Sequence, residues 1–152
     1  MQSPFMGRAG GPAKAASRSL VWTLLALVVA AVFVYAGAAK ITDPSKFAHD
    51  IQNFKIVPWS IAIRAAFYLP WLEIICGIAL LFEPLRRGAL AILTGLVAVF
   101  IVATISAQAR GINLDCGCFG SASKGMTFGM HMLIDGAILA ALIALWILPT
   151  RR

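Results

Sequence analysis

Charged residues are scarce in this 152-residue chain: they make up 12% of it, and only six are acidic. A soluble domain usually has about 25% charged and about 45–50% apolar residues. This sequence is 61% apolar, with a mean hydropathy of +0.88. The scarcity of charge argues against an ordinary soluble domain and predicts a membrane protein. The net charge is +7. Because the basic residues lie beside apolar runs, they are better explained as groups that orient the chain in a membrane than as a nucleic-acid-binding surface.

Long apolar runs account for most of the chain. Four stretches of about 20 residues can each cross a ~30 Å hydrocarbon layer at ~1.5 Å rise per residue. They are predicted as helices at residues 20–39, 61–82, 88–108 and 128–148. No internal repeat is visible, so nothing supports the inverted-repeat architecture of many transporters. The expected fold class is all-α, with a four-transmembrane-helix bundle forming one membrane domain over residues 20–149.

The ends and flanks predict the orientation. Residues 1–19 are rich in Gly, Ala, Ser and Pro and are predicted to be a disordered cytoplasmic tail, while residues 150–152 form a basic cytoplasmic end. The first apolar run exceeds the about 7–15 residues of a signal-peptide core, so it is interpreted as a retained helix. More Lys and Arg residues flank the helices on the side of the membrane that holds the N-terminus than on the opposite side. This bias predicts that both termini of the multi-pass protein are cytoplasmic.

The first outer loop, residues 40–60, is predicted to contain a short amphipathic helix. Asp43 followed by Pro44 is a typical helix start, because Asp caps free amides and proline suits the first turn. Phe47, Ile51 and Phe54 are spaced to share one face. Two interpretations stay open: a helix lying in the membrane interface, or a cap packed on the bundle.

The segment NLDCGCFGSASKG, residues 113–125, places two thiols in a polar loop between two apolar stretches. Cys116 and Cys118 can form a bridge only if the backbone bends tightly, and Gly117 permits the dihedral angles that this requires. Strained and exposed disulfides are the labile, oxidising ones. With the termini inside, this loop lies on the outer face, where disulfides persist.

Charged neighbours influence this thiol pair. Arg110 and Lys124 favour the thiolate form, whereas Asp115 opposes it. A redox-active dithiol is the preferred interpretation, but a static disulfide and two idle thiols stay open. A metal site that His49 and His131 complete is a further alternative. Because two thiolates supply only two of the four usual ligands, no metal is predicted.

Charges inside the second apolar run are candidate functional groups, because charge within lipid is costly. Glu73 follows Pro70 and is expected near or beyond mid-membrane, where it can pair with a basic group, exchange a proton or contact a polar ligand. Arg64 lies close to the outer end and can extend its head to the interface. Cys76 in the same run is expected to be an inert buried thiol.

The fourth run contains His131 and Asp135 at i and i+4, so both side chains share one face near the outer end. One interpretation is that Asp135 orients His131 to move the protons of thiol exchange. The other is a hydrogen bond that joins two helices. The sequence favours neither of these interpretations.

Three runs resemble one family: YAGAAKITDPSKFAHDIQNFKIVP, WLEIICGIALLF and ARGINLDCGCFG are similar to the MauE branch of the DoxX-like membrane proteins. The likeness covers nearly all of residues 20–149. It implies a four-helix bundle in the bacterial cytoplasmic membrane, with Cys116 and Cys118 as a redox pair and Glu73 as the membrane carboxylate. It also implies a role in methylamine utilisation, in maturation or export of the disulfide-rich small subunit of methylamine dehydrogenase. Other relatives are linked to thiol redox balance and to sulfur-compound oxidation that feeds quinone.

The combined interpretation is a membrane thiol–disulfide oxidoreductase, or its accessory. Cys116 and Cys118 exchange disulfides with an extracytoplasmic client, and electrons pass to a membrane acceptor. Quinone is the candidate acceptor, and no covalently bound cofactor is expected. The expected partners are the lipid bilayer, the client and the acceptor, and an oligomer is compatible with the sequence. The alternatives are a membrane scaffold or maturation factor with a structural or metal-holding Cys loop, and a small transporter.

Overall fold

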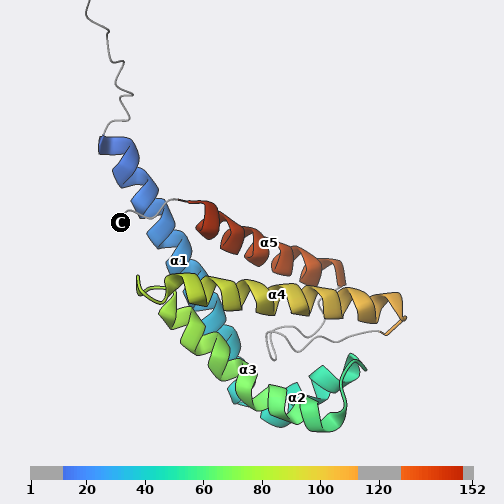
Figure 1. The fold of residues 1–152 in the computed structure, drawn as a ribbon. Helices are drawn as coiled ribbons and strands as arrows, with labels where there is room; N and C mark the ends of the chain where they lie inside the picture. Colours follow the sequence, from blue (N-terminus) through green and yellow to red (C-terminus); the bar gives the residue numbers. More distant parts are fainter. Residues whose placement is uncertain (1–11, 113–127, 149–152) are drawn as a thin grey trace, which may run out of the picture.

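A computed structural model describes residues 12–112 and 128–148, which contain helices and no strand (Figure 1). The helices are α1 (Pro12–Ile41), α2 (Pro44–Asn53), α3 (Trp59–Ala79), α4 (Arg86–Ala109) and α5 (Phe128–Ile147). Four segments are long and apolar enough to cross a membrane: Leu20–Ile41 of α1, and all of α3, α4 and α5. The prediction of an all-α protein with four candidate spans is therefore confirmed.

The start of the first helix corrects the sequence prediction. Helix α1 begins at Pro12, so residues 12–19 are helical and not part of a disordered tail. Proline suits the first helical position, and the alanines that follow have the highest helix propensity. Composition alone gave the wrong result because extending a helix that the apolar span has already nucleated is far easier than forming one. Residues 1–11 lie outside the described part of the chain.

The four long helices pack in a closed order in which α1 contacts α3 and α5, and α4 contacts α3 and α5. Their shared core includes Trp22, Phe33, Leu80 and Leu93. In Figure 1, α3 and α4 lie close together near the short connection between them and diverge toward their other ends, where α2 lies. We call this second end, which carries α2 and the last turn of α4, the α2 end of the bundle.

The contact between α1 and α3 is unusually close because glycine lies on both helices. A Cβ atom added at Gly37 would lie 2.6 Å from the carbonyl oxygen of Pro70 and 2.7 Å from Cγ1 of Ile74. On the other helix, a Cβ atom at Gly77 would lie 3.2 Å from the carbonyl oxygen of Ala30. Small residues allow helix backbones to approach in this way. The approach fixes the register of α1 against α3.

Helix α2 packs on the bundle through its apolar face. Asp43 caps it as predicted, since its Oδ1 accepts a hydrogen bond from the amide of Lys46 at 3.0 Å. Phe47 and Ala48 are buried against Ala66 of α3. Of the two interpretations that the sequence left open, these contacts support the cap.

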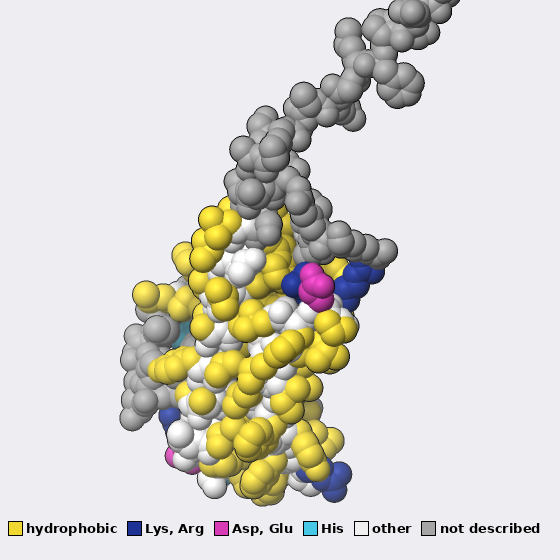
Figure 2. Space-filling model, turned by 90° about the vertical axis from the view of Figure 1, so that its left-hand side faces the viewer, with side chains coloured by type: hydrophobic (Ala, Val, Ile, Leu, Met, Phe, Trp, Pro, Cys, Tyr) yellow, Lys and Arg dark blue, Asp and Glu magenta, His cyan; other side chains and the backbone are white. Residues whose placement is uncertain are grey.

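The outside of the bundle is largely apolar. Figure 2 shows one face covered by hydrophobic side chains, with charged side chains gathered near its right-hand edge and at its lower end. Large apolar side chains such as Tyr68, Val99 and Leu133 are exposed along the long helices. An apolar surface of this extent is unusual for a monomeric soluble protein and fits a lipid environment.

Replacement of Gly37 by alanine should destabilise the bundle. We expect Gly37→Ala to lower the free energy of unfolding by about 1–3 kcal/mol, because the added methyl group meets backbone that cannot easily move. Thermal unfolding in detergent measures the effect. Gly95→Ala in α4 is the matched control, because a Cβ atom there has nothing within 4 Å. Equal melting temperatures for the two variants would show that the close approach does not matter.

Candidate functional site

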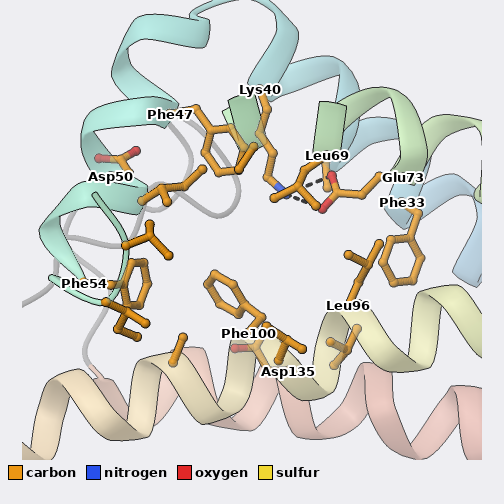
Figure 3. A pocket seen from close by; sticks show the side chains of 18 of the residues that line it. Phe33, Lys40, Phe47, Asp50, Phe54, Leu69, Glu73, Leu96, Phe100 and Asp135 are labelled. Atoms are coloured by element: carbon orange, nitrogen blue, oxygen red, sulfur yellow. Dashed lines mark hydrogen bonds and ion pairs between the residues drawn. The ribbon is translucent and has the colours of Figure 1, made fainter. Parts of the chain in front are cut away.

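A cavity of about 320 Å³ lies at the α2 end, where the divergence of α3 and α4 separates the helices (Figure 3). All five helices contribute to its lining. Most of its wall is apolar and includes the rings of Phe33, Phe47, Phe54 and Phe100. Its volume is within the range of small-molecule sites, about 300–1,000 Å³, which typically combine apolar walls with a few polar groups.

An ion pair between α1 and α3 forms one polar part of this wall. The Lys40 ammonium donates hydrogen bonds to both carboxylate oxygens of Glu73, at 2.6 and 2.8 Å. The two side chains are only 9% and 12% exposed. The ring of Phe47 adds a cation–π contact, with its centroid 5.2 Å from Lys40 Nζ. Of the three roles that the sequence left open for Glu73, pairing with a basic group is confirmed.

The register of α1 against α3 explains how this pair forms. Gly37 precedes Lys40 by about one helical turn, and Pro70 precedes Glu73 by the same interval. Helices α1 and α3 run antiparallel, because Gly37 lies against Pro70 and Ile74 whereas Gly77 lies against Ala30. Glu73 is therefore about level with Gly37, and the Lys40 side chain reaches it by pointing back toward the N-terminus of α1. Glu73 thus lies about one turn inside the end of α1, whose last turn contains Lys40. Counting residues along α3 alone placed it deeper.

His131 and Asp135 are on the α5 side of the bundle and share a face, as predicted. They are 3% and 7% exposed. Asp135 lines the cavity close to Phe100, across from the ion pair (Figure 3). Within the described residues, Asp135 Oδ2 and His131 Nε2 are buried without a hydrogen-bond partner. Leaving a buried polar atom unpaired costs about 1–3 kcal/mol. Of the two residues only Asp135 lines the cavity, so its Oδ2 would gain from a ligand with a matching group.

Asp50 adds a third carboxyl group to the cavity wall, from α2. Burial raises the pKa of Asp50 above the usual aspartate value. The charge of Lys46 opposes this rise, that of Asp43 adds to it, and that of His49 opposes it. The sequence gives no sign of this role, because the cavity that Asp50 lines forms only when helices distant in the chain pack beside α2.

Two other predicted residues do not reach the cavity. Arg64 is exposed and does not line it, so the structure does not bring Arg64 and Glu73 together in one intramembrane site. Their helical spacing explains the separation, because nine residues place them on different sides of α3. Cys76 is a free thiol buried in the core beside Phe33 and Leu80, as predicted.

Arg110 ties the end of α4 to the end of α2. Its Nη2 donates to the carbonyl oxygen of Phe54 at 2.7 Å, and its Nη1 to that of Lys55 at 3.3 Å. Its Nε donates to the carbonyl oxygen of Ser106 within α4, at 3.0 Å. Phe54 also packs edge-on against Phe100, with the ring centroids 5.9 Å apart. These contacts close one side of the cavity.

The predicted thiol site itself lies outside the described residues. This applies to Cys116, Gly117, Cys118, Asp115 and Lys124. Across residues 12–112 and 128–148, no group of three or more His, Cys, Asp or Glu side chains could hold a metal ion.

Sequence reasoning assigned neither Lys40 nor Asp50 to a site. Lys40 was counted as a charge flanking the first span and as part of the run that resembles MauE proteins, without a role of its own. A signal was available in its position within the last turn of an apolar helix, one turn after a glycine. Side chains on a helix point back toward its N-terminus, so a lysine at this position reaches into the bundle. Only the packing of α3 shows that a carboxylate meets it there.

Four candidate membrane spans around a largely apolar cavity with a few charged groups in its wall define a polytopic helical membrane protein. A family model described as methylamine utilisation protein MauE matches residues 17–149. The chain therefore belongs to the MauE family.

Two curated relatives carry the name methylamine utilization protein MauE. The protein from Methylophilus methylotrophus is 32% identical over 117 residues, which cover 76% of this chain and 62% of the relative. The protein from Methylorubrum extorquens is 29% identical over 135 residues, which cover 86% of this chain and 71% of the relative. The chain thus spans less than two thirds of the first relative's length. No solved structure matches it.

The ion pair should show strong energetic coupling. Lys40→Met or Glu73→Met alone leaves one charge buried without a partner, and we expect each to cost about 3–5 kcal/mol. The double variant should be much less destabilised, because no unpaired charge remains. Unfolding of all four proteins in detergent forms a double-mutant cycle. Losses that simply add in the double variant would contradict coupling between the two residues.

Neutralising Asp50 should change how stability depends on pH. A raised pKa means that the folded chain holds this proton more tightly than the unfolded chain, so wild-type stability falls as pH rises from the usual aspartate pKa through the raised one. Asp50→Asn should lack this decrease and be more stable than wild type at neutral pH. Melting temperatures across acid and neutral pH test this, with Glu83→Gln, at an exposed carboxylate, as control. Parallel curves for wild type and Asp50→Asn would be the contrary result.

Proposed function

We propose that this chain is a membrane component of methylamine utilisation that carries out thiol–disulfide exchange. Cys116 and Cys118 cycle between dithiol and disulfide against an extracytoplasmic client protein, and their electrons pass to an acceptor in the membrane. The family and the names of the two relatives support the metabolic context. The Cys-Gly-Cys sequence supports the chemistry, because a strained small-ring disulfide is a good oxidant.

The observation that carries the proposal is where the chain on either side of the thiols attaches. On one side, Ile112 packs with Phe54 and Ala107. On the other, Phe128 begins α5, whose Asp135 lines the cavity. Ile112 and Phe128, the described residues on either side of segment 113–127, therefore both lie at the α2 end, the end of the bundle that carries the cavity. In this proposal, the α2 end faces outward and both termini are cytoplasmic.

The exchange follows ordinary thiol chemistry. A client thiolate attacks one sulfur of the Cys116–Cys118 disulfide, forming a mixed disulfide and releasing the other cysteine as thiolate. The second client thiolate then breaks the mixed disulfide, so the client is oxidised and the pair is reduced by two electrons. Passing two electrons and two protons to a membrane acceptor restores the disulfide. A quinone has the capacity to take both, which makes it the proposed acceptor class.

A second candidate function is that of a membrane scaffold with a structural Cys loop. Arg110 favours this candidate, because its guanidinium is committed to carbonyl groups of Phe54, Lys55 and Ser106. These hydrogen bonds hold the end of α4 to the end of α2, and this structural role requires no redox chemistry. The two candidates differ in whether the thiols change state.

The thiol state in intact membranes separates them. In a Cys76→Ser background, acid trapping followed by labelling with a heavy maleimide reports only on Cys116 and Cys118. We expect the pair to accumulate as dithiol when the respiratory acceptor is removed and to become disulfide when oxidised quinone is added. The variant that also carries Cys116→Ser and Cys118→Ser is the blank. A thiol state that ignores the acceptor would refute the exchange function and leave the scaffold.

A matching measurement tests the biological role. The test uses a methylamine-using host that lacks its own protein of this family and is complemented with this chain. Either Cys116→Ser or Cys118→Ser in the complementing chain should abolish growth on methylamine. Growth equal to wild type would favour the scaffold.

A further inference from the structure

We propose that the cavity binds a membrane-soluble amphiphile with a neutral aromatic head that bears hydroxyl groups, of the hydroquinone type. One hydroxyl donates a hydrogen bond to Asp135, and the apolar tail leaves toward the bilayer between Ile61 and Val99. The inference rests on the proposed function for the redox role of the ligand, since it gives the membrane acceptor a place and a chemical class. Binding itself is argued from the cavity alone.

The head group is indicated by the polar atoms in the wall. Asp135 Oδ2 is buried and has no hydrogen-bond partner among the described residues, so it needs a donor. The ammonium of Lys40 is already bonded to both oxygens of Glu73 and is not available as that donor. Around these groups, the rings of Phe33 and Phe100 offer aromatic faces and edges. A ring that carries a hydroxyl group matches this combination.

The charges of the wall favour a neutral head over an anionic one. Among the described residues that line the cavity, Lys40 is the single cation, whereas three carboxyl groups, those of Asp50, Glu73 and Asp135, line it. A phosphate or carboxylate head would meet like charge without an available cation, at a cost that is large in apolar surroundings. This argues against a phospholipid headgroup or a fatty acid as the ligand.

The route of entry is indicated by the apolar rim. Ile61 of α3 and Val99 of α4 line the cavity and are also 47% and 70% exposed on the outer surface of the bundle. They lie on the two helices that diverge toward the α2 end (Figure 1). In this proposal, the opening of the cavity lies between these two apolar side chains, where molecules can enter from the bilayer. A cavity of about 320 Å³ can hold a ring but not a long tail as well, so the tail extends through this opening.

Calorimetric titration of the full-length chain in lipid nanodiscs tests the proposal, with decylubiquinol as the probe. The protein carries Cys76→Ser, Cys116→Ser and Cys118→Ser, so that no thiol reaction consumes the probe. Empty nanodiscs correct for partition into lipid. We expect saturable binding that Asp135→Leu weakens about tenfold or more, because the variant removes the hydrogen-bond partner of the hydroxyl group.

A pair of tryptophan variants tests the opening. Val99→Trp should weaken binding by a similar factor, because the indole fills the rim. Val102→Trp should bind as the parent does, because Val102 is equally exposed on α4 but does not line the cavity. If Val99→Trp does not fold, Ile61→Trp on α3 takes its place.

Two results would overturn the inference. One is that decylubiquinol does not bind, or that it binds equally well to the parent protein, to Asp135→Leu and to the rim variant. The other is Asp135-dependent binding of methylammonium in place of decylubiquinol, which would make the cavity a site for a small organic cation. Because these proteins lack thiols, the result is independent of the thiol-trapping experiment. Failure of the proposed exchange function therefore leaves quinol binding intact, and failure of binding leaves a responsive thiol pair intact.

Discussion

The ion pair of Lys40 and Glu73 is the constraint on which the cavity end of this bundle depends. Two charges are held almost out of contact with solvent, and each has acceptable energy only while the other is beside it. That requirement fixes the last turn of α1 against the part of α3 that follows Pro70. The close approach at Gly37 makes the same alignment by shape. Charge and packing thus select one register.

Fixing α1 on α3 has consequences for the other helices. With α3 held to α1, the divergence between α3 and α4 leaves space between them, and this space is the cavity. Helix α2 packs on α3, and Arg110 joins its end to the end of α4. The α2 end therefore holds a partly covered, largely apolar chamber with a few charged groups in its wall, whereas the opposite end is closely packed.

This division of the bundle separates the tasks of the proposed function. In the proposed function, the thiols are on the segment that joins Ile112 to Phe128, and these two residues lie at the α2 end, where a soluble client can approach. The proposed opening of the cavity lies between apolar side chains, where a lipid-soluble acceptor can approach. Asp135 lines the cavity from α5, the helix that follows the thiol segment in the chain.

The spans and the cap of α2 could be predicted because each depends on local sequence. About 20 apolar residues specify a membrane helix wherever they occur, and Asp43 before Pro44 specifies a helix start through its own side chain. The burial of Cys76 followed from its position within such a span. The start of α1 at Pro12 was missed, because helix propagation from a neighbouring span outweighs the composition of a short segment.

The partners of the charged residues could not be predicted in the same way. The sequence by itself determined that Glu73 and Asp135 lie in apolar helices, that two thiols lie one glycine apart, and that the chain resembles MauE proteins. Only the tertiary structure decided that Lys40 neutralises Glu73, that Arg64 lies apart from both, and that Asp50 and Asp135 face one cavity. The physical reason is that hydropathy along the chain determines which segments become membrane helices. The partner of a charged residue in such a helix depends instead on which side chain of another helix packs against it.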